Sequence, residues 1–156
     1  MAFKYQFETI LNLKIRMEDM KNAELKLAIE RMENEKRKLD KLLNEKKSEE
    51  QLFKEKQEQH FTAEDLRLFN NYISALKKKI EYQESIVKKE EKKVEKVREE
   101  LIKASKEKKM FEKLKEKKYE EYMHEYYAAE QQVVDNIVSF KYNGNGGAED
   151  EWEKRW

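Results

Sequence analysis

Apolar residues in the second half of the chain recur on a seven-residue grid that begins near residue 66. Their spacing alternates between three and four residues, which places them on one stripe of an α-helix. Five heptads kept in phase predict a long helix that packs along this stripe against a partner helix, with left-handed supercoiling. One row of the stripe comprises Leu66, Ile73, Ile80, Val87, Val94 and Leu101, and the other comprises Phe69, Leu76, Gln83, Glu90, Val97, Ala104 and Phe111.

The first half of the chain follows a less regular pattern. Phe7 and Ile10 belong to an early apolar phase, and Met17 and Met20 are expected to bridge it to a later one. The later phase comprises Leu25, Ala28, Met32, Leu39, Leu42 and Phe53, with Glu35, Lys46 and Glu49 as polar members. This pattern predicts a second coiled-coil helix over residues 3–57.

The stretch "HFTAEDL" marks a boundary between the two patterns. The hydroxyl of Thr62 can accept from the backbone N–H of Asp65, whose negative charge is favourable in the first turn of a helix. Phe61 and Leu66 have the spacing of a hydrophobic staple. We therefore expect a turn at residues 58–62 and a helix that begins at residue 63.

Two helices joined by a short turn run antiparallel. The predicted fold is all-α: an antiparallel two-helix coiled-coil hairpin over residues 1–142, whose second helix extends to about residue 140. By counting back from the turn, we expect the first helix to be exhausted near Lys118, so that the longer second helix overhangs at the open end. A new apolar phase follows there, through Tyr119, Tyr122, Tyr126, Ala129, Val133 and Phe140.

Composition favours this architecture. Charged residues make up 44% of the chain and hydrophobic residues 38%, with no proline and three glycines, which suits long helices with a narrow seam better than a thick core. All three glycines lie in residues 143–156, which we expect to form a flexible tail after a helix stop at Asn143 and Gly144. Trp152 and Trp156 lie in that tail, and a short linear interaction motif is one of the interpretations that stay open for them.

The charge balance and the hydropathy limit the classes of partner. A net charge of +1, with lysines interleaved among glutamates, disfavours a nucleic-acid-binding protein. No stretch approaches the roughly 20 apolar residues that span a bilayer, and the amino terminus lacks the apolar run of a signal peptide. We therefore expect a soluble, cytoplasmic protein without direct membrane insertion.

Residues suited to catalysis are few. His60 lies beside the predicted turn. His124 lies near three glutamates on the second helix, but a third ligand that converges on the same point, which a metal site would need, is missing. No phosphate-binding loop, nucleophile elbow or zinc-protease pattern occurs. The sequence predicts neither enzyme activity nor a metal site or cofactor.

Three segments carry a resemblance to a known family. They are "EDLRLFNNYISALKKKIEYQ" (64–83), "FEKLKEKKYEEY" (111–122) and "AAEQQVVDNIVSFKY" (128–142). With the opening "FKYQFETILNLKI", they resemble the bacterial flagellar export protein FliJ family over residues 1–142. The resemblance implies a coiled coil similar to the central-stalk gamma subunit of rotary ATPases. It further implies a cytoplasmic location at the flagellar basal body, beside the inner membrane.

The same resemblance implies three partners in type III protein export: the export ATPase ring, the cytoplasmic domain of the export-gate membrane protein, and export chaperones. Carried over by position, the export-gate contact comprises Tyr72, Leu76, Lys79 and Gln83, of which Lys79 departs from the smaller residue associated with that place. The ATPase contact would lie at the open end. Its hypothesised patch comprises Phe7, Ile10, Leu11, Tyr122, Tyr126, Val133, Val134 and Ile137.

Two other classes of protein stay open. A structural spacer or a self-assembling dimer would bury the overhang against a second copy, whereas the partner-binding interpretation expects a chain that is monomeric alone. A nucleic-acid-binding helical arm would show steeply salt-dependent binding.

Overall fold

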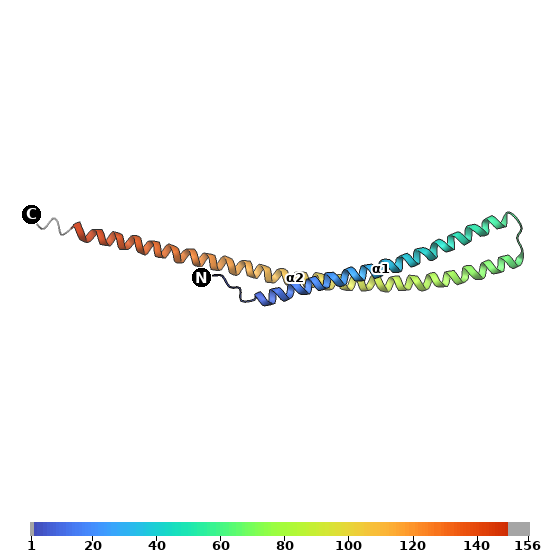
Figure 1. Cartoon of the computed structure of the whole chain (residues 1–156), viewed down its shortest axis with the longest axis horizontal. Coiled ribbons are helices and arrows are strands. Elements are labelled where there is room, and N and C mark those ends of the chain that lie inside the picture. Colours follow the sequence, from blue (N-terminus) through green and yellow to red (C-terminus); the bar gives the residue numbers. More distant parts are fainter. Residues whose placement is uncertain (1, 150–156) are drawn as a thin grey trace, which may run out of the picture. The chain divides into compact units, whose positions relative to one another are not determined.

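A computed structural model describes the backbone of residues 2–149 and the side chains of residues 2–144. Two long helices, α1 (Glu8–Gln57) and α2 (Ala63–Glu149), account for nearly all of it. They are joined by residues 58–62 and lie side by side in opposite directions (Figure 1). The described residues contain no strand, so the predicted all-α two-helix hairpin is confirmed.

The chain divides into two compact units. One unit, called here the hairpin unit, is Leu13–Glu107. The other, called the terminal unit, combines Met1–Asn12 with Lys108–Trp156. The single hairpin that the sequence predicts for residues 1–142 is thus built from two units, each with its own packing.

The core of the hairpin unit is the predicted stripe of α2. Its most buried side chain is Leu76, of which only 2% is exposed, and the other buried members lie on the same stripe at spacings of three, four, seven and ten residues. They are Ile73, Ile80, Gln83, Val87, Val94 and Ala104. Burying a large aliphatic side chain stabilises a fold by about 1.5–3 kcal/mol, so this row is the main source of stability.

The seam of α1 departs from the sequence prediction near its start. Met17 and Met20, which were expected to bridge two apolar phases, are exposed. Lys14 and Lys21 lie on the seam instead, and their amines pair with Glu107 and Glu100 of α2 at 2.8 Å each. Lysine stems can cover apolar surface while the charged amine remains in water, so a polar residue keeps the heptad phase here.

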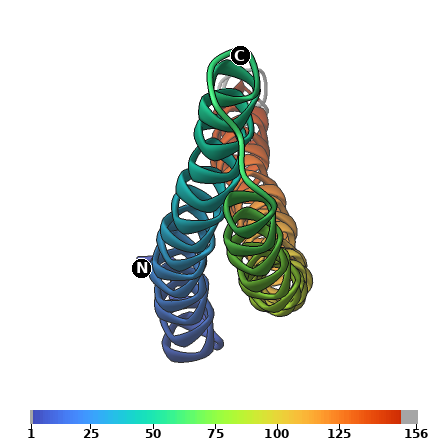
Figure 2. The same ribbon diagram turned by 90° about the vertical axis from the view of Figure 1, so that its right-hand side faces the viewer.

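The turn is held by a reciprocal cap. The backbone N–H of Asp65 donates to the Thr62 hydroxyl at 3.2 Å, as predicted, and the Thr62 N–H donates to the Asp65 carboxylate at 3.3 Å. Phe61 packs edge-on against Phe53 of α1, with ring centroids 5.0 Å apart. Figure 2 shows the turn crossing from the end of α1 to the start of α2.

In the terminal unit, α1 begins at Glu8 and not at residue 3. The preceding residues form a non-helical strap, defined here as residues 2–7, which packs aromatic side chains against α2. Tyr5 is buried, and its hydroxyl donates to the backbone carbonyl of Phe111 at 3.0 Å. The strap lacks a good N-cap residue, and its non-helical backbone lets its aromatic rings reach α2.

The carboxyl end of α2 also differs from the sequence prediction. The helix passes the expected end at residue 140 and the expected stop at Asn143 and Gly144, and continues to Glu149. A glycine stop requires a left-handed conformation, but no described glycine has a positive φ. Each helical glycine costs about 1 kcal/mol relative to alanine, which a long helix tolerates when no proline interrupts it. Trp152 and Trp156 of the expected tail lie outside the described residues.

Candidate functional site

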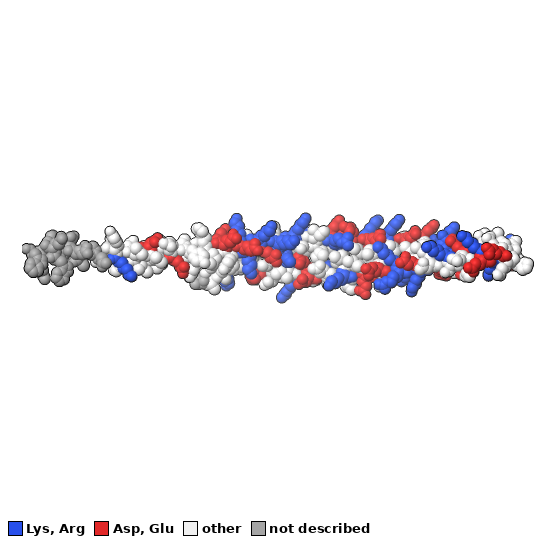
Figure 3. Space-filling model, turned by 90° about the horizontal axis from the view of Figure 1, so that it is seen from above, with Lys and Arg blue, Asp and Glu red and all other residues white. Residues whose placement is uncertain are grey.

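The carboxyl-terminal stretch of α2 exposes apolar side chains over a long distance. Every side chain from His124 to Gly144 is exposed, including large ones such as Phe140, 80% of whose surface is accessible. The other exposed large apolar residues are Tyr126, Tyr127, Val133, Val134, Ile137, Val138 and Tyr142. On the face shown in Figure 3, charged side chains alternate in sign over the hairpin unit and become sparse along this stretch. Large contiguous apolar surfaces of this kind typically mark interaction sites.

The strap extends this surface with a row of rings. Phe3 contacts Tyr119 and Tyr122, with centroid distances of 5.3 and 5.5 Å. Tyr122 stacks on Tyr126 at 6.4 Å, and Tyr126 meets Tyr127 at 5.9 Å. A hydrogen bond to Glu130 raises the pKa of Tyr126, so that side chain is held by its own helix. We call Phe3, Tyr119, Tyr122, Tyr126 and Tyr127 the aromatic row.

The predicted ATPase-binding residues fall into two groups. Tyr126, Val133, Val134 and Ile137 are exposed on one stretch of α2, and Tyr122 is half-buried beside them. Of the amino-terminal members, Ile10 is 40% exposed, whereas Leu11 is 4% exposed and lies in the packed seam. Phe7 is half-buried against Phe111, with ring centroids 6.5 Å apart.

Phe3, Tyr119 and Tyr127 are the members of the aromatic row that sequence reasoning left out of the patch. Tyr119 stands in the apolar phase that the sequence showed, so its position on the helix was a usable signal. Phe3 had no such signal. It lies in the non-helical strap, where helical spacing does not predict which side chains reach α2.

The predicted export-gate residues also divide by exposure. Tyr72 is 40% exposed and Lys79 is exposed, whereas Leu76 is buried between the helices. The Tyr72 hydroxyl donates to the Glu45 carboxylate of α1, and this bond raises the pKa of Tyr72. Two of the four side chains are therefore accessible on the surface.

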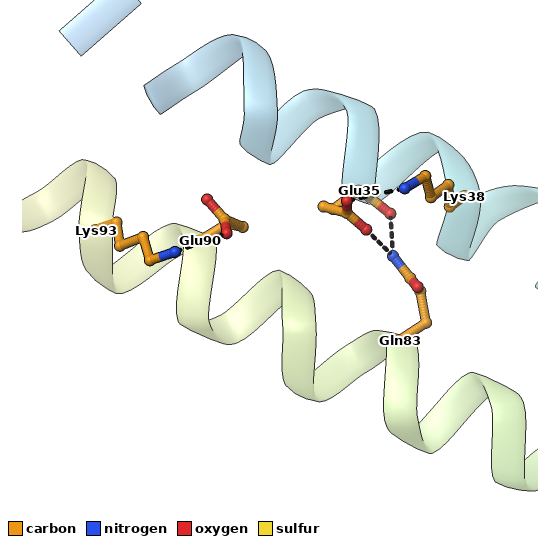
Figure 4. Close-up of polar contacts among 5 residues, drawn as sticks. All are labelled: Glu35, Lys38, Gln83, Glu90 and Lys93. Carbon is orange, nitrogen blue, oxygen red and sulfur yellow. Dashed lines mark hydrogen bonds and ion pairs between the residues drawn. The ribbon is translucent and has the colours of Figure 1, made fainter. Parts of the chain in front are cut away.

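Gln83 is the other buried member, with 8% of its surface exposed. Its amide donates to the backbone carbonyl of Glu35 at 3.0 Å and also to the Glu35 carboxylate (Figure 4). The bond from Gln83, followed by one from Lys38, lowers the pKa of Glu35. Gln83 thus acts as a polar layer within the seam, a common device for fixing the register of a coiled coil.

A shallow hollow lies next to Tyr72 at the turn end of the hairpin unit. Its volume is about 300 Å³. It is lined by side chains of both helices and of the turn, namely Glu49, Leu52, Phe53, Lys56, Phe61, Asp65, Leu68, Phe69 and Tyr72. Phe53 and Phe69 stack face to face at its base, with centroids 3.9 Å apart. The sequence had indicated these rings only as seam residues.

Within residues 2–149, no cluster of three or more His, Cys, Asp or Glu side chains is arranged to hold a metal ion. No helix in the same range is long and apolar enough to cross a membrane.

Comparison with known protein families finds one match that covers nearly the whole chain. Residues 3–147 match the family described as flagellar FliJ protein. No curated protein and no solved structure matches the chain.

Proposed function

This chain belongs to the FliJ family, and from that premise we propose that it works as a stalk of the flagellar type III export apparatus. Membership makes it a coiled-coil protein related to flagellar export. The proposal is more specific: a non-catalytic stalk in the cytoplasm, at the basal body, that joins the export ATPase to the export gate and escorts export chaperones.

The exposed stretch of α2 carries the ATPase part of the proposal. Residues 124–144 show no buried side chain, and the strap ends its contacts near Tyr122. A helix with apolar side chains on several sides gains stability when a partner surrounds it. The ATPase ring is the partner that the family resemblance implies for this end.

The gate part of the proposal concerns the α2 face around Tyr72 and Lys79. Both side chains are accessible, and the hollow beside Tyr72 offers apolar rings to an incoming side chain. Leu76 and Gln83 support this face from within the seam. Loss of either would affect gate binding through the packing of the hairpin.

A pull-down with the cognate export ATPase tests the first part. Full-length chain should retain the ATPase, and a chain truncated after Lys118 should lose it while keeping the helical circular dichroism signal of the hairpin. A truncated chain that binds as well as full length contradicts the proposal.

A titration with the cytoplasmic domain of the export gate tests the second part. Tyr72→Ala should weaken binding, whereas Ile102→Ala, which alters an exposed large side chain much farther along α2, should leave it unchanged. Equal affinity of Tyr72→Ala and the unmodified chain would remove Tyr72 from the site.

The exposed apolar stretch also supports a second candidate, a structural spacer that dimerises through this segment. Sedimentation over a range of concentrations separates the two candidates. A persistent monomer favours the stalk, whereas a tight dimer that shields the tyrosines favours the spacer.

A further inference from the structure

The stretch that carries the aromatic row differs in charge from the rest of the chain. Residues 119–140 contain five carboxylates and no lysine or arginine, although the whole chain has 35 basic and 34 acidic residues. The five are Glu120, Glu121, Glu125, Glu130 and Asp135. The surface is therefore aromatic, apolar and negatively charged at once.

The helical period places the carboxylates beside the rings. Positions 119, 122, 126, 133 and 140 follow one side of α2, and positions 125 and 130 fall on opposite flanks of that side. Tyr126 is 44% exposed, and both Glu125 and Glu130 are exposed. A cation that approaches the ring of Tyr126 would thus meet a carboxylate on either side.

We propose that the aromatic row, with its flanking carboxylates, is a docking surface for arginine side chains on the partner protein. A guanidinium group can stack on a tyrosine ring and pair with a carboxylate at the same time, which a lysine amine does less well. This inference rests on the proposed function, because it describes the chemistry of the partner that seats the carboxyl-terminal stretch of α2.

Charge also disfavours a second copy of the same stretch as the occupant. Two such segments packed together would bring five carboxylates against five, of which only Glu121 has a basic partner in the described part of the chain, Lys118 at 2.8 Å. Like charges that face each other destabilise a helical pair. A nucleic acid is disfavoured for the same reason, because its phosphates are negative.

The strap is part of the docking surface. Phe3 lies against both Tyr119 and Tyr122, and so extends the row from a second segment of the chain. Lys115 pairs with Glu8 at 2.8 Å and lies 5.9 Å from the centre of the Tyr5 ring. The chain thus already contains one cation held by a carboxylate and a tyrosine, next to the aromatic row.

The test compares variants of the full chain by isothermal titration calorimetry against two probes, the purified cognate export ATPase and an acetylated hexaarginine peptide. One variant, Tyr122→Leu with Tyr126→Leu, keeps apolar side chains and removes the rings. Another, Glu125→Gln with Glu130→Gln, removes two charges. The matched control, Glu95→Gln with Glu99→Gln, makes the same charge change on an exposed part of the hairpin unit.

We expect both variants of the aromatic row to bind each probe about tenfold more weakly, which corresponds to about 1.4 kcal/mol. The control should bind like the unmodified chain. Raising NaCl from about 50 to about 300 mM should weaken the unmodified chain more than the Glu125→Gln, Glu130→Gln variant.

Two results overturn the inference. The first is that both variants bind the ATPase with unchanged affinity, while the double variant Val133→Asp with Ile137→Asp does not bind it. The surface would then bind through its apolar side chains alone, and the proposed function would stand. The other is a hexaarginine affinity that does not distinguish the variants from the control. If the unmodified chain fails to bind the ATPase, the proposed function fails, and the hexaarginine titration still decides the inference.

Discussion

Two stretches of α2 are similarly rich in apolar residues but differ in exposure. In the hairpin unit, Ile73, Leu76 and Val94 are at least 92% buried against α1. In the terminal unit, Val133, Ile137 and Phe140 are between 52% and 80% exposed. The apolar positions recur at helical spacing in both places.

The difference follows from chain length. α1 supplies 50 residues and α2 supplies 87, so part of α2 necessarily lies beyond the reach of α1. Apolar periodicity therefore indicates that a stretch needs a partner, and the length of the pairing helix decides whether that partner is in the same chain. The stretch left over is where binding of another protein is expected.

The largest expected difference in the free energy of unfolding is between truncating a side chain in the hairpin unit and truncating one in the exposed stretch. Leu76→Ala should lower the free energy of unfolding by about 2–4 kcal/mol, because it leaves a cavity in the seam. Phe140→Ala should change it by less than about 0.5 kcal/mol. Urea unfolding followed by circular dichroism measures both. Equal losses would show that the second stretch is packed in the isolated chain.

The polar layer gives a smaller effect. Gln83→Ala removes the donor to Glu35 within the seam and should cost about 1–2 kcal/mol in urea unfolding. Gln131→Ala removes an amide that donates to Asp135 on exposed α2 at 3.0 Å, and should cost less than about 0.5 kcal/mol. A Gln83→Ala chain as stable as the Gln131→Ala chain would argue against the polar layer.

The end of α2 allows a change in the stabilising direction. Gly144→Ala should stabilise the last turns by about 0.5–1 kcal/mol, because Gly144 is helical and an added Cβ meets nothing within 4 Å. Amide hydrogen exchange near residue 144 should slow, with no change in the hairpin unit. Faster exchange in the variant would indicate a left-handed helix stop at this position.

The smallest effect is the pH dependence of the cross-helix ion pairs. Bonds from Lys14 and Lys21 lower the pKa of Glu107 and Glu100, respectively. Because the folded pKa is depressed, these pairs stabilise the hairpin above the ordinary glutamate pKa, and that contribution is lost as pH falls through the folded value.

Thermal unfolding between about pH 7 and about pH 3 should therefore show a falling melting temperature, with a flatter profile for Glu107→Gln. Glu121→Gln is the matched variant in the other stretch. The bond from Lys118 likewise lowers the pKa of Glu121, but it lies within one helix. An equal flattening by both variants would show that the ion pairs across the two helices have no special role.

The seam of α2 could be predicted from sequence because its apolar residues keep one phase over five heptads. The start of the α1 seam could not, because Lys14 and Lys21 occupy seam positions while the apolar Met17 and Met20 point to solvent. A hydrophobicity pattern alone does not show that a lysine stem can pack in a seam when its amine has a carboxylate opposite it.

The exposure of the proposed binding surface was predicted in part. Tyr126, Val133 and Ile137 were assigned to it from the overhang and the family resemblance together, and the structure leaves them exposed. Leu11 was assigned to the patch but is buried, since sequence position near an end does not determine which way a side chain faces. Phe3 was missed because its contact depends on the path of a non-helical strap.

Photo-crosslinking in cells from position 126 tests the central claim most directly. A photoreactive residue in place of Tyr126 should capture the export ATPase, while the same residue at Tyr82, which is 70% exposed in the hairpin unit, should not. A crosslink from position 126 to a second copy of this chain, with none to the ATPase, would contradict the account.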